Sequence, residues 1–124
     1  MYQPKTEKDI RCPLEYAMDL FGGKWKPRVI CILGLNGRMR YGELKRELEN
    51  ITDTVLAATL KEMIRDDLVE RIQYDEIPPK VEYTLTKSGM SVVPVLGNIC
   101  LWAEMKLNDN DAPKFCTKCY YKRR

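Results

Sequence analysis

The chain has 124 residues, of which 44% are hydrophobic and 31% charged with a net charge of +3; this fits one domain with a modest core and excludes a disordered polymer. Its longest apolar run, VICILGL at 29–35, is far shorter than the roughly 20 residues that span a bilayer, and the N-terminus lacks the apolar middle of a secretory signal, so we expect a cytoplasmic protein with no membrane partner. The absence of histidine removes the commonest general base and a frequent metal ligand, and we expect no cofactor and no metal site.

Two helices are predicted on the N-terminal side. The stretch CPLEYAMDLFGG spaces its apolar residues Leu14, Ala17, Met18 and Phe21 as a helix does, and its two glycines end that helix. The stretch KWKPRVICILGLNG predicts the second helix, closed by Asn-Gly. RMRY at 38–41 is a candidate short strand.

A helix pair follows, at 42–50 and 52–66. In the second helix Thr52 is the expected N-cap and Asp53 suits the positive end of the helix dipole, while Asp67 suits the left-handed position at the C-terminal end. One face carries Leu56, Leu60 and Met63. The other face is small near the start of the helix and basic further along, so another surface can approach its backbone closely; it carries Thr54, Ala57, Ala58, Lys61 and Arg65.

Two strands and a long helix complete the predicted domain. LVERIQYDE and KVEYTLT read as a hairpin over 69–86, joined by IPP; Pro78 and Pro79 stiffen its tip and Lys80 supplies charge there. The helix at 86–107 has an apolar surface wider than one small domain can cover, which predicts a partner helix. Pro94 should kink this helix or delay its regular start.

This order of elements predicts a mainly α fold with a small β-hairpin, a winged helix–turn–helix. The second helix of the pair would enter the DNA major groove, and the hairpin would be a positioning arm. Residues 41–82 hold 6 basic and 11 acidic side chains, so binding of double-stranded DNA requires the basic ones on one face. The expected DNA-binding residues are Arg40, Lys45, Thr52, Thr54, Ala57, Ala58, Lys61, Arg65 and Lys80.

The ordered motifs CPLEYAMDLFGGKW, RYGELKREL, LVERIQYDEIPPKVEYTLTKSG and PVLGNICLWA resemble the HxlR-type winged helix–turn–helix transcriptional regulators of bacteria, over residues 12–105. The resemblance implies a homodimer built by the N-terminal and long C-terminal helices, which binds an inverted-repeat operator. It also implies no enzymatic activity, and we expect a repressor. Thr54 stands where the family commonly has a basic residue, and Asp67 where it commonly has Gly. The expected dimerisation residues are Leu14, Met18, Val95, Ile99 and Trp102.

We expect an N-terminal arm at 1–11, the DNA-binding and dimerisation domain at 12–107 and a basic tail at 108–124. The five cysteines form no expected disulfide framework. Cys12 occupies the family's CPL motif, where several members sense quinones, aldehydes or oxidants, and Arg11 and the helix start favour its thiolate. Cys116 and Cys119 in CTKC could form a redox pair, share a zinc site across a dimer or be inert.

Two rival functions remain open. A winged helix can serve as a protein–protein module without binding DNA, and the negative charge of residues 41–82 favours that alternative; steep salt dependence would argue for DNA. A thiol oxidoreductase using the CTKC cysteines is the other rival, but the chain lacks the βαβ pattern that accompanies such motifs.

Overall fold

The computed structural model describes residues 11–107. Most of the predicted N-terminal arm and the whole predicted basic tail, with Cys116 and Cys119, lie outside the described residues. Within 11–107, no helix combines the length and the apolarity needed to cross a bilayer.

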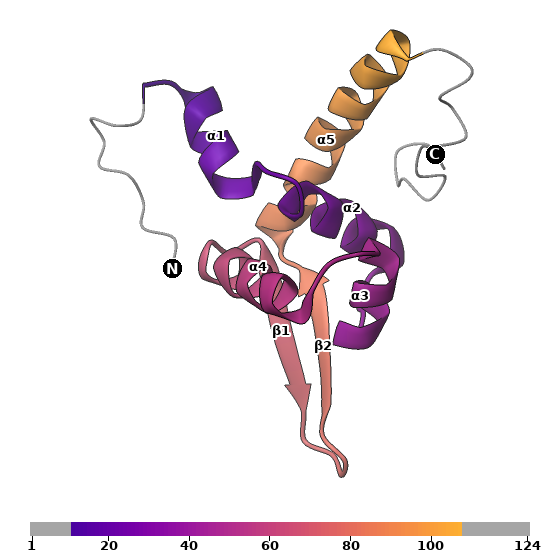
Figure 1. Cartoon of the computed structure of the whole chain (residues 1–124). Helices are drawn as coiled ribbons and strands as arrows, with labels where there is room; N and C mark the ends of the chain where they lie inside the picture. Colours follow the sequence, from indigo (N-terminus) through magenta and orange to yellow (C-terminus); the bar gives the residue numbers. More distant parts are fainter. Residues whose placement is uncertain (1–10, 108–124) are drawn as a thin grey trace.

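The described chain is mainly helical with one two-stranded antiparallel ribbon, as predicted. In Figure 1, α2, α3 and α4 gather at the centre, the ribbon projects from them in one direction, and α1 and α5 extend in the opposite direction. The elements are α1 Pro13–Phe21, α2 Lys26–Asn36, α3 Tyr41–Leu48, α4 Asp53–Arg65, β1 Val69–Tyr74, β2 Lys80–Leu85 and α5 Lys87–Lys106.

The core lies where the inner faces of α2, α3, α4 and the first half of α5 meet the base of the ribbon. The predicted inner residues of α4, Leu56, Leu60 and Met63, are all buried there, and each such side chain contributes about 1.5–3 kcal/mol of burial free energy. α2 and α5 pack closely at Gly34. A Cβ added there would lie only 3.0 Å from Val93 Cγ2 of α5. Other buried members include Val29, Ile30, Leu33, Leu44, Leu48, Val69 and Leu96.

Two boundaries differ from the sequence prediction. The strand expected at 38–41 is reduced to one bridge, in which the backbones of Met39 and Tyr83 exchange hydrogen bonds of 2.9 and 2.7 Å; the turn at Gly37 and the start of α3 leave no room for more. α3 begins at Tyr41 and ends at Leu48, because Glu49 and Asn50 both take left-handed backbone angles (φ 50° and 61°).

The caps and the long helix follow the sequence more closely. The Thr52 hydroxyl accepts from the Val55 N–H at 3.2 Å, and Asp67 takes the left-handed conformation (φ 61°), as predicted. Thr86 caps α5 by accepting from the Gly89 N–H at 3.0 Å. Pro94 does not delay this helix, which runs unbroken from Lys87 to Lys106.

Side-chain bonds fix the helix–turn–helix pair onto α2. Arg28 Nη2 donates to the Leu48 carbonyl at the end of α3 at 2.9 Å. Lys26 Nζ lies 2.9 Å from Glu62 Oε1 on α4, and this hydrogen bond lowers the pKa of the Glu62 carboxyl. Both helices of the pair are therefore tied to the same supporting helix.

We expect Gly89→Ala to lower the free energy of unfolding by about 3 kcal/mol, because overpacking against rigid backbone is among the costly core changes. A Cβ on Gly89 would lie 2.2 Å from the Leu68 carbonyl oxygen, which belongs to the backbone at the start of the ribbon. The measurement is thermal unfolding, with an expected fall in Tm of more than about 10 °C.

Gly42→Ala is the matched control. No heavy atom lies within 4 Å of a Cβ added at Gly42, so this change should be neutral or slightly stabilising through helix propensity. Equal Tm values for the two variants would contradict the close approach of α5 to Leu68.

Candidate nucleic-acid interface

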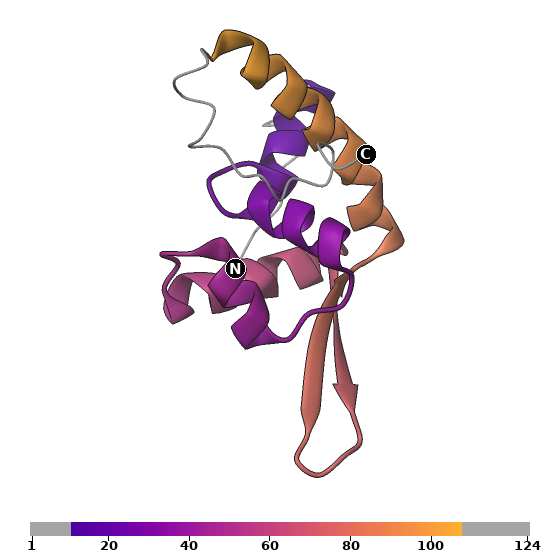
Figure 2. The ribbon, with the colours of Figure 1, turned by 90° about the vertical axis from the view of Figure 1, so that its right-hand side faces the viewer.

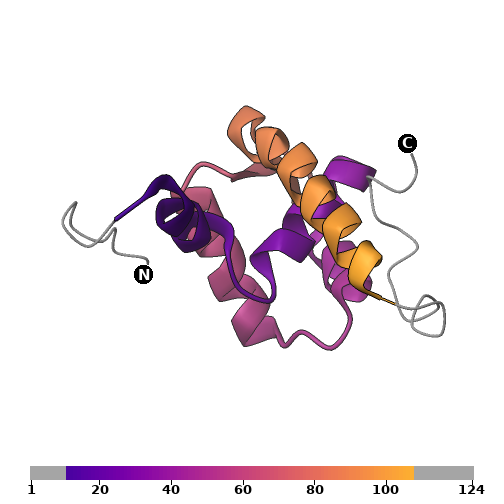
Figure 3. The ribbon, with the colours of Figure 1, turned by 90° about the horizontal axis from the view of Figure 1, so that it is seen from above.

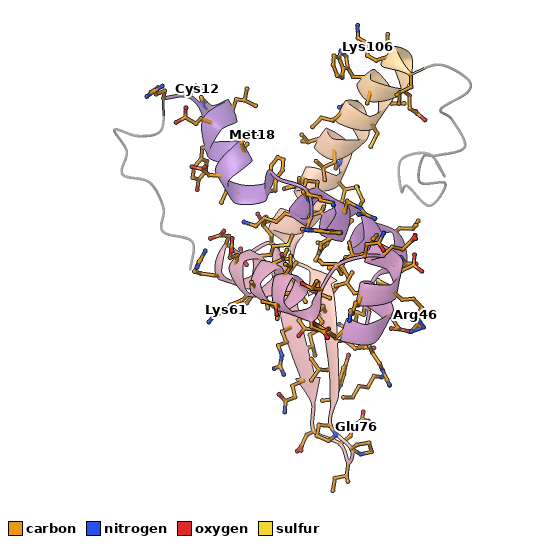
Figure 4. The ribbon with its side chains drawn as sticks, viewed as in Figure 1. Cys12, Met18, Arg46, Lys61, Glu76 and Lys106 are labelled. Atoms are coloured by element: carbon orange, nitrogen blue, oxygen red, sulfur yellow. The ribbon has the colours of Figure 1, made fainter. Side chains whose placement is uncertain are left out.

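The outer face of α4 is open to solvent, as the sequence predicts. Thr54, Ala57, Ala58 and Lys61 are all exposed, while Leu56, Thr59, Leu60 and Met63 on the inner face are buried. In Figure 4, Lys61 lies on the side of α4 from which the ribbon projects. The exposed face therefore presents a slim surface beside the ribbon, with a cation along it.

The start of α4 is joined to α3 by a polar cluster. Lys45 Nζ lies 3.1 Å from Asp53 Oδ1, and the Tyr41 hydroxyl lies 3.1 Å from the same oxygen and 3.2 Å from the Asp53 carbonyl. The hydrogen bond from Lys45, and to a lesser extent the one from Tyr41, lowers the pKa of the Asp53 carboxyl. Burial and the Asp53 hydrogen bond raise the pKa of Tyr41.

Three other predicted contacts are placed around this face. Arg40 is exposed at the N-cap of α3, where its N–H donates to Glu43 Oε1 at 2.8 Å. Thr52 is exposed, but its hydroxyl is used as the cap of α4. The Arg65 side chain is only 24% exposed, and its Nε lies 3.7 Å from Asp66 Oδ1. Arg65 is thus the most covered cation of the predicted set on α4.

The ribbon, or wing, pairs Val69 with Leu85 at its base and Tyr74 with Lys80 at its outer end. Figure 2 shows it extending well beyond the helices. Lys80 belongs to the ladder and not to the tip: its Nζ lies 5.0 Å from the centre of the Tyr74 ring and 3.8 Å from Glu82 Oε2. The tip itself carries Asp75, Glu76 and a fully exposed Ile77 (100%).

Lys80, expected to bring charge to the wing tip, lies at the outer end of the ladder directly after Pro79, and its Nζ is 3.8 Å from Glu82 Oε2. The alternation of β2 turns Lys80 to the same face of its strand as Glu82, which allows the ion pair between them. The charge at the tip is instead negative, from Asp75 and Glu76.

Three arginines near this surface were missed by the sequence reasoning. Arg38 Nη1 donates to the Tyr74 hydroxyl at 2.6 Å, and that hydroxyl donates to Glu82 Oε1 at 2.9 Å. Arg71 is exposed two residues after the buried Val69 and so shares its face of β1. Arg46 lies at the outer edge of α3 (Figure 4). Strand alternation could have identified Arg71; only the Met39–Tyr83 bridge explains the position of Arg38.

The helices on the opposite side of the molecule expose large apolar side chains. Leu14 and Met18 of α1 and Val95, Ile99 and Trp102 of α5 are all exposed, with Leu14 at 67% and Trp102 at 62%. In Figure 3, seen from above, α1 and α5 lie across the top of the helical body. Further exposed apolar residues on these two helices are Tyr16, Met90, Leu101 and Met105.

Cys12 is an exposed free thiol at the N-cap position of α1, and Figure 4 shows it at the end of α1 remote from the wing. Its carbonyl accepts from the Tyr16 N–H at 3.3 Å. Cys31 and Cys100 are half-buried, on α2 and α5. Among residues 11–107, no three His, Cys, Asp or Glu side chains are grouped to hold a metal ion.

The family model of the HxlR-like helix-turn-helix matches residues 20–111. The chain belongs to this family. Among its relatives, MalR of Fusobacterium mortiferum, named as a regulatory protein, is 45% identical over 104 residues, covering 84% of this chain and 98% of MalR. The HTH-type transcriptional regulator YdzF of Bacillus subtilis is 45% identical over 92 residues, covering 74% and 84%.

Solved structures agree with this HxlR-like assignment. The redox regulator HypR in its oxidized form has a TM-score of 0.71 at 35% identity, covering 78% of this chain and 99% of HypR. The reduced form of the transcriptional regulator YodB from B. subtilis has a TM-score of 0.69 at 34% identity, covering 77% and 93%. The chain is thus a helix–turn–helix transcriptional regulator, and the relatives named here are named as regulators.

Proposed function

We propose that this HxlR-like protein binds double-stranded DNA sequence-specifically as a homodimer, on an inverted-repeat operator, and represses transcription there. The observation that carries the proposal is the outer face of α4, which is exposed and presents the short side chains of Thr54, Ala57 and Ala58. The major groove is about 12 Å wide and admits one α-helix. A helix whose exposed residues are Thr54, Ala57, Ala58 and Lys61 can lie deep in it.

The contacts divide by chemistry. The Thr54 hydroxyl and methyl and the methyls of Ala57 and Ala58 suit base edges and thymine methyl groups. Lys61 is placed further along α4 to meet a phosphate. Arg40 and Lys45 supply positive charge from α3, and Arg38 and Arg71 supply it from the base of the wing. These cations fix the register on the duplex, and α4 reads the sequence.

The homodimer is supported by the apolar side chains that α1 and α5 expose. Leu14, Met18, Val95, Ile99 and Trp102 are exposed on helices that leave the body on the side opposite the wing. A single protein of this size rarely leaves so much apolar surface uncovered without a partner. A two-fold axis through this surface would place the two α4 helices on successive half-sites of an inverted repeat.

The experiment is selection of bound duplexes from a random pool, followed by titration of the selected operator at increasing salt. Counterion release predicts that log K falls linearly with log[salt], with a slope of about −0.9 for each phosphate contact. A selected inverted repeat bound with a steep negative slope supports the proposal. If no sequence is enriched and binding to any duplex is undetectable at low salt, the protein–protein alternative replaces it, and the acidic, apolar wing tip is then its contact surface.

We further propose that modification of Cys12 controls DNA binding. The similar solved structures also include diamide-treated YodB, with a TM-score of 0.65 at 32% identity, and quinone-bound YodB, with a TM-score of 0.64 at 31% identity. In this chain Cys12 is exposed at the start of α1. A quinone accepts the Cys12 sulfur at a ring carbon, and the thiol and ring hydrogens end on the two oxygens as a hydroquinone, so no other oxidant is needed. The adduct would lie beside Leu14, one of the proposed dimer contacts.

Treatment with benzoquinone should lower the operator affinity of the wild type by at least about tenfold, which is a typical allosteric coupling. The operator affinity of Cys12→Ser should not change on treatment. Mass spectrometry establishes that Cys12 carries the adduct, and mobility-shift titration measures the affinity. Cys31→Ser serves as the control thiol and should respond like the wild type. Full modification of Cys12 with unchanged operator affinity would contradict a role for this thiol.

A further inference from the structure

A carboxylate lies on the surface that would face DNA. Asp53 is the first residue of α4, and its side chain is 71% exposed. It lies beside Lys45, whose side chain is 40% exposed and whose Nζ is 3.1 Å from Asp53 Oδ1. Tyr41 adds a hydrogen bond of 3.1 Å to the same oxygen. One of the cations available from α3 is therefore already bound to an acid of the same protein.

This arrangement is unfavourable for simple attraction to DNA. The start of a helix carries exposed N–H groups and positive dipole charge, which would attract a phosphate. Asp53 puts a negative charge at that point instead, and its bond to Lys45 cancels a positive charge nearby. Attraction to phosphates supplies essentially all non-specific binding. For Lys45 to bind a phosphate in such a complex, it would have to break its ion pair with Asp53, and no base contact would compensate for that loss.

The operator complex differs in this respect. There the base contacts of Thr54, Ala57 and Ala58 fix the position of α4, so a phosphate of the correct register can be held beside Lys45. We propose that Asp53 is a specificity-determining residue. Its ion pair keeps Lys45 from the phosphates of arbitrary DNA, and this pair breaks only when α4 is bound at its operator. This rests on the proposed function, since it requires that α4 enters the groove.

The test compares Asp53→Asn with the wild type on a random-sequence duplex and on the selected operator. Asparagine keeps the shape, and its amide oxygen can still accept the Tyr41 hydrogen bond, but it no longer pairs with Lys45 as an ion. Affinity for the random duplex should rise about fivefold per protomer, the effect of one unit charge at contact distance in water. The salt slope for binding of the random duplex should steepen by about 0.9 per protomer. The ratio of operator affinity to random-duplex affinity should fall.

Asp67→Asn is the matched control. It makes the same change of charge just past the other end of α4, about 20 Å away along the helix axis, which is about two and a half times the Debye length at physiological salt. Asparagine also tolerates the left-handed backbone at that position. This variant should keep both the wild-type salt slope and the wild-type ratio.

Lys45→Gln supplies the second arm. If Asp53 acts by holding Lys45, then Asp53→Asn should raise affinity for the random duplex less in the Lys45→Gln background than in the wild type. An equal rise in both backgrounds would overturn the role of the pair. A Tyr41→Phe variant, which loses a hydrogen bond and no charge, should leave the salt slope unchanged, and this separates the electrostatic effect from a change in helix position.

The outcomes separate the two proposals. If the wild type binds its operator but Asp53→Asn and Asp67→Asn show the same affinities and slopes, the specificity role of Asp53 is overturned and the DNA-binding function stands. If the wild type binds no duplex, both fail together.

Discussion

Ala58→Glu should lower the affinity for the selected operator by about 1,000-fold while leaving the fold intact. Ala58 is exposed in the middle of α4, so a longer side chain there displaces nothing in the core. In the proposed complex it would place a carboxylate in the groove of each half-site. A cost of about 2 kcal/mol per half-site, within the range of a wrong base pair, gives about 4 kcal/mol for the dimer, and each 1.4 kcal/mol is a factor of ten.

Ala58→Gln is the matched control, because it has nearly the size of glutamate and no charge. Its loss should be smaller, about tenfold, since the amide can still bond a base edge. Mobility-shift titration measures both affinities, and thermal unfolding shows whether the variants keep the wild-type Tm. Operator affinity of Ala58→Glu equal to that of the wild type would show that this face of α4 does not touch DNA.

The helices and their caps were predictable because each depends on residues close together in the sequence. The buried stripe of Leu56, Leu60 and Met63 and the Thr52 cap are local patterns, and both appear in the structure. The left-handed Asp67 was predictable for the same reason, because helix ends need a residue that tolerates a positive φ. The order of these elements predicted a winged helix–turn–helix, and the resemblance of the motifs to the HxlR family supported it.

The strand at 38–41 could not be predicted in length, because its extent depends on a partner far along the chain. Met39 pairs only with Tyr83, and the residues on both sides of it are committed to the end of α2 and the start of α3. The ion pairs of Lys45 and Lys80 likewise could not be predicted from the sequence. A cation's partner is set by the packing of elements, so exposed lysines that look available for phosphate can already be bound to carboxylates, as these two are to Asp53 and Glu82.

The outer face of α5 shows the same division between local and distant information. The sequence shows that the helix is apolar nearly all round, but not which stripe is covered by its own chain. In the structure Val92, Val93 and Leu96 are buried, whereas Val95, Ile99 and Trp102 are not. The three residues of this helix that the sequence assigns to the dimer, Val95, Ile99 and Trp102, are therefore among those that its own chain leaves exposed.

This exposed stripe leads to the second large effect. Ile99→Glu should weaken the proposed dimer by more than about 100-fold, because a two-fold interface contains each residue twice. Two carboxylates would then face one another in an apolar contact, and burying a charge without a partner is strongly unfavourable. Sedimentation at several concentrations measures the monomer–dimer equilibrium. Operator affinity should fall with it, since a monomer engages one half-site only.

Ser88→Glu provides the control for added charge on α5. Ser88 is exposed in the first turn of the helix, where an acid is favourable to the dipole, and it lies about 16 Å from Ile99 along the axis. This variant should dimerise like the wild type. Because Ile99 is half-exposed and outside the buried core, the glutamate variant should also keep a folded monomer with cooperative unfolding. A folded Ile99→Glu protein that remains dimeric would place the dimer contact on another surface.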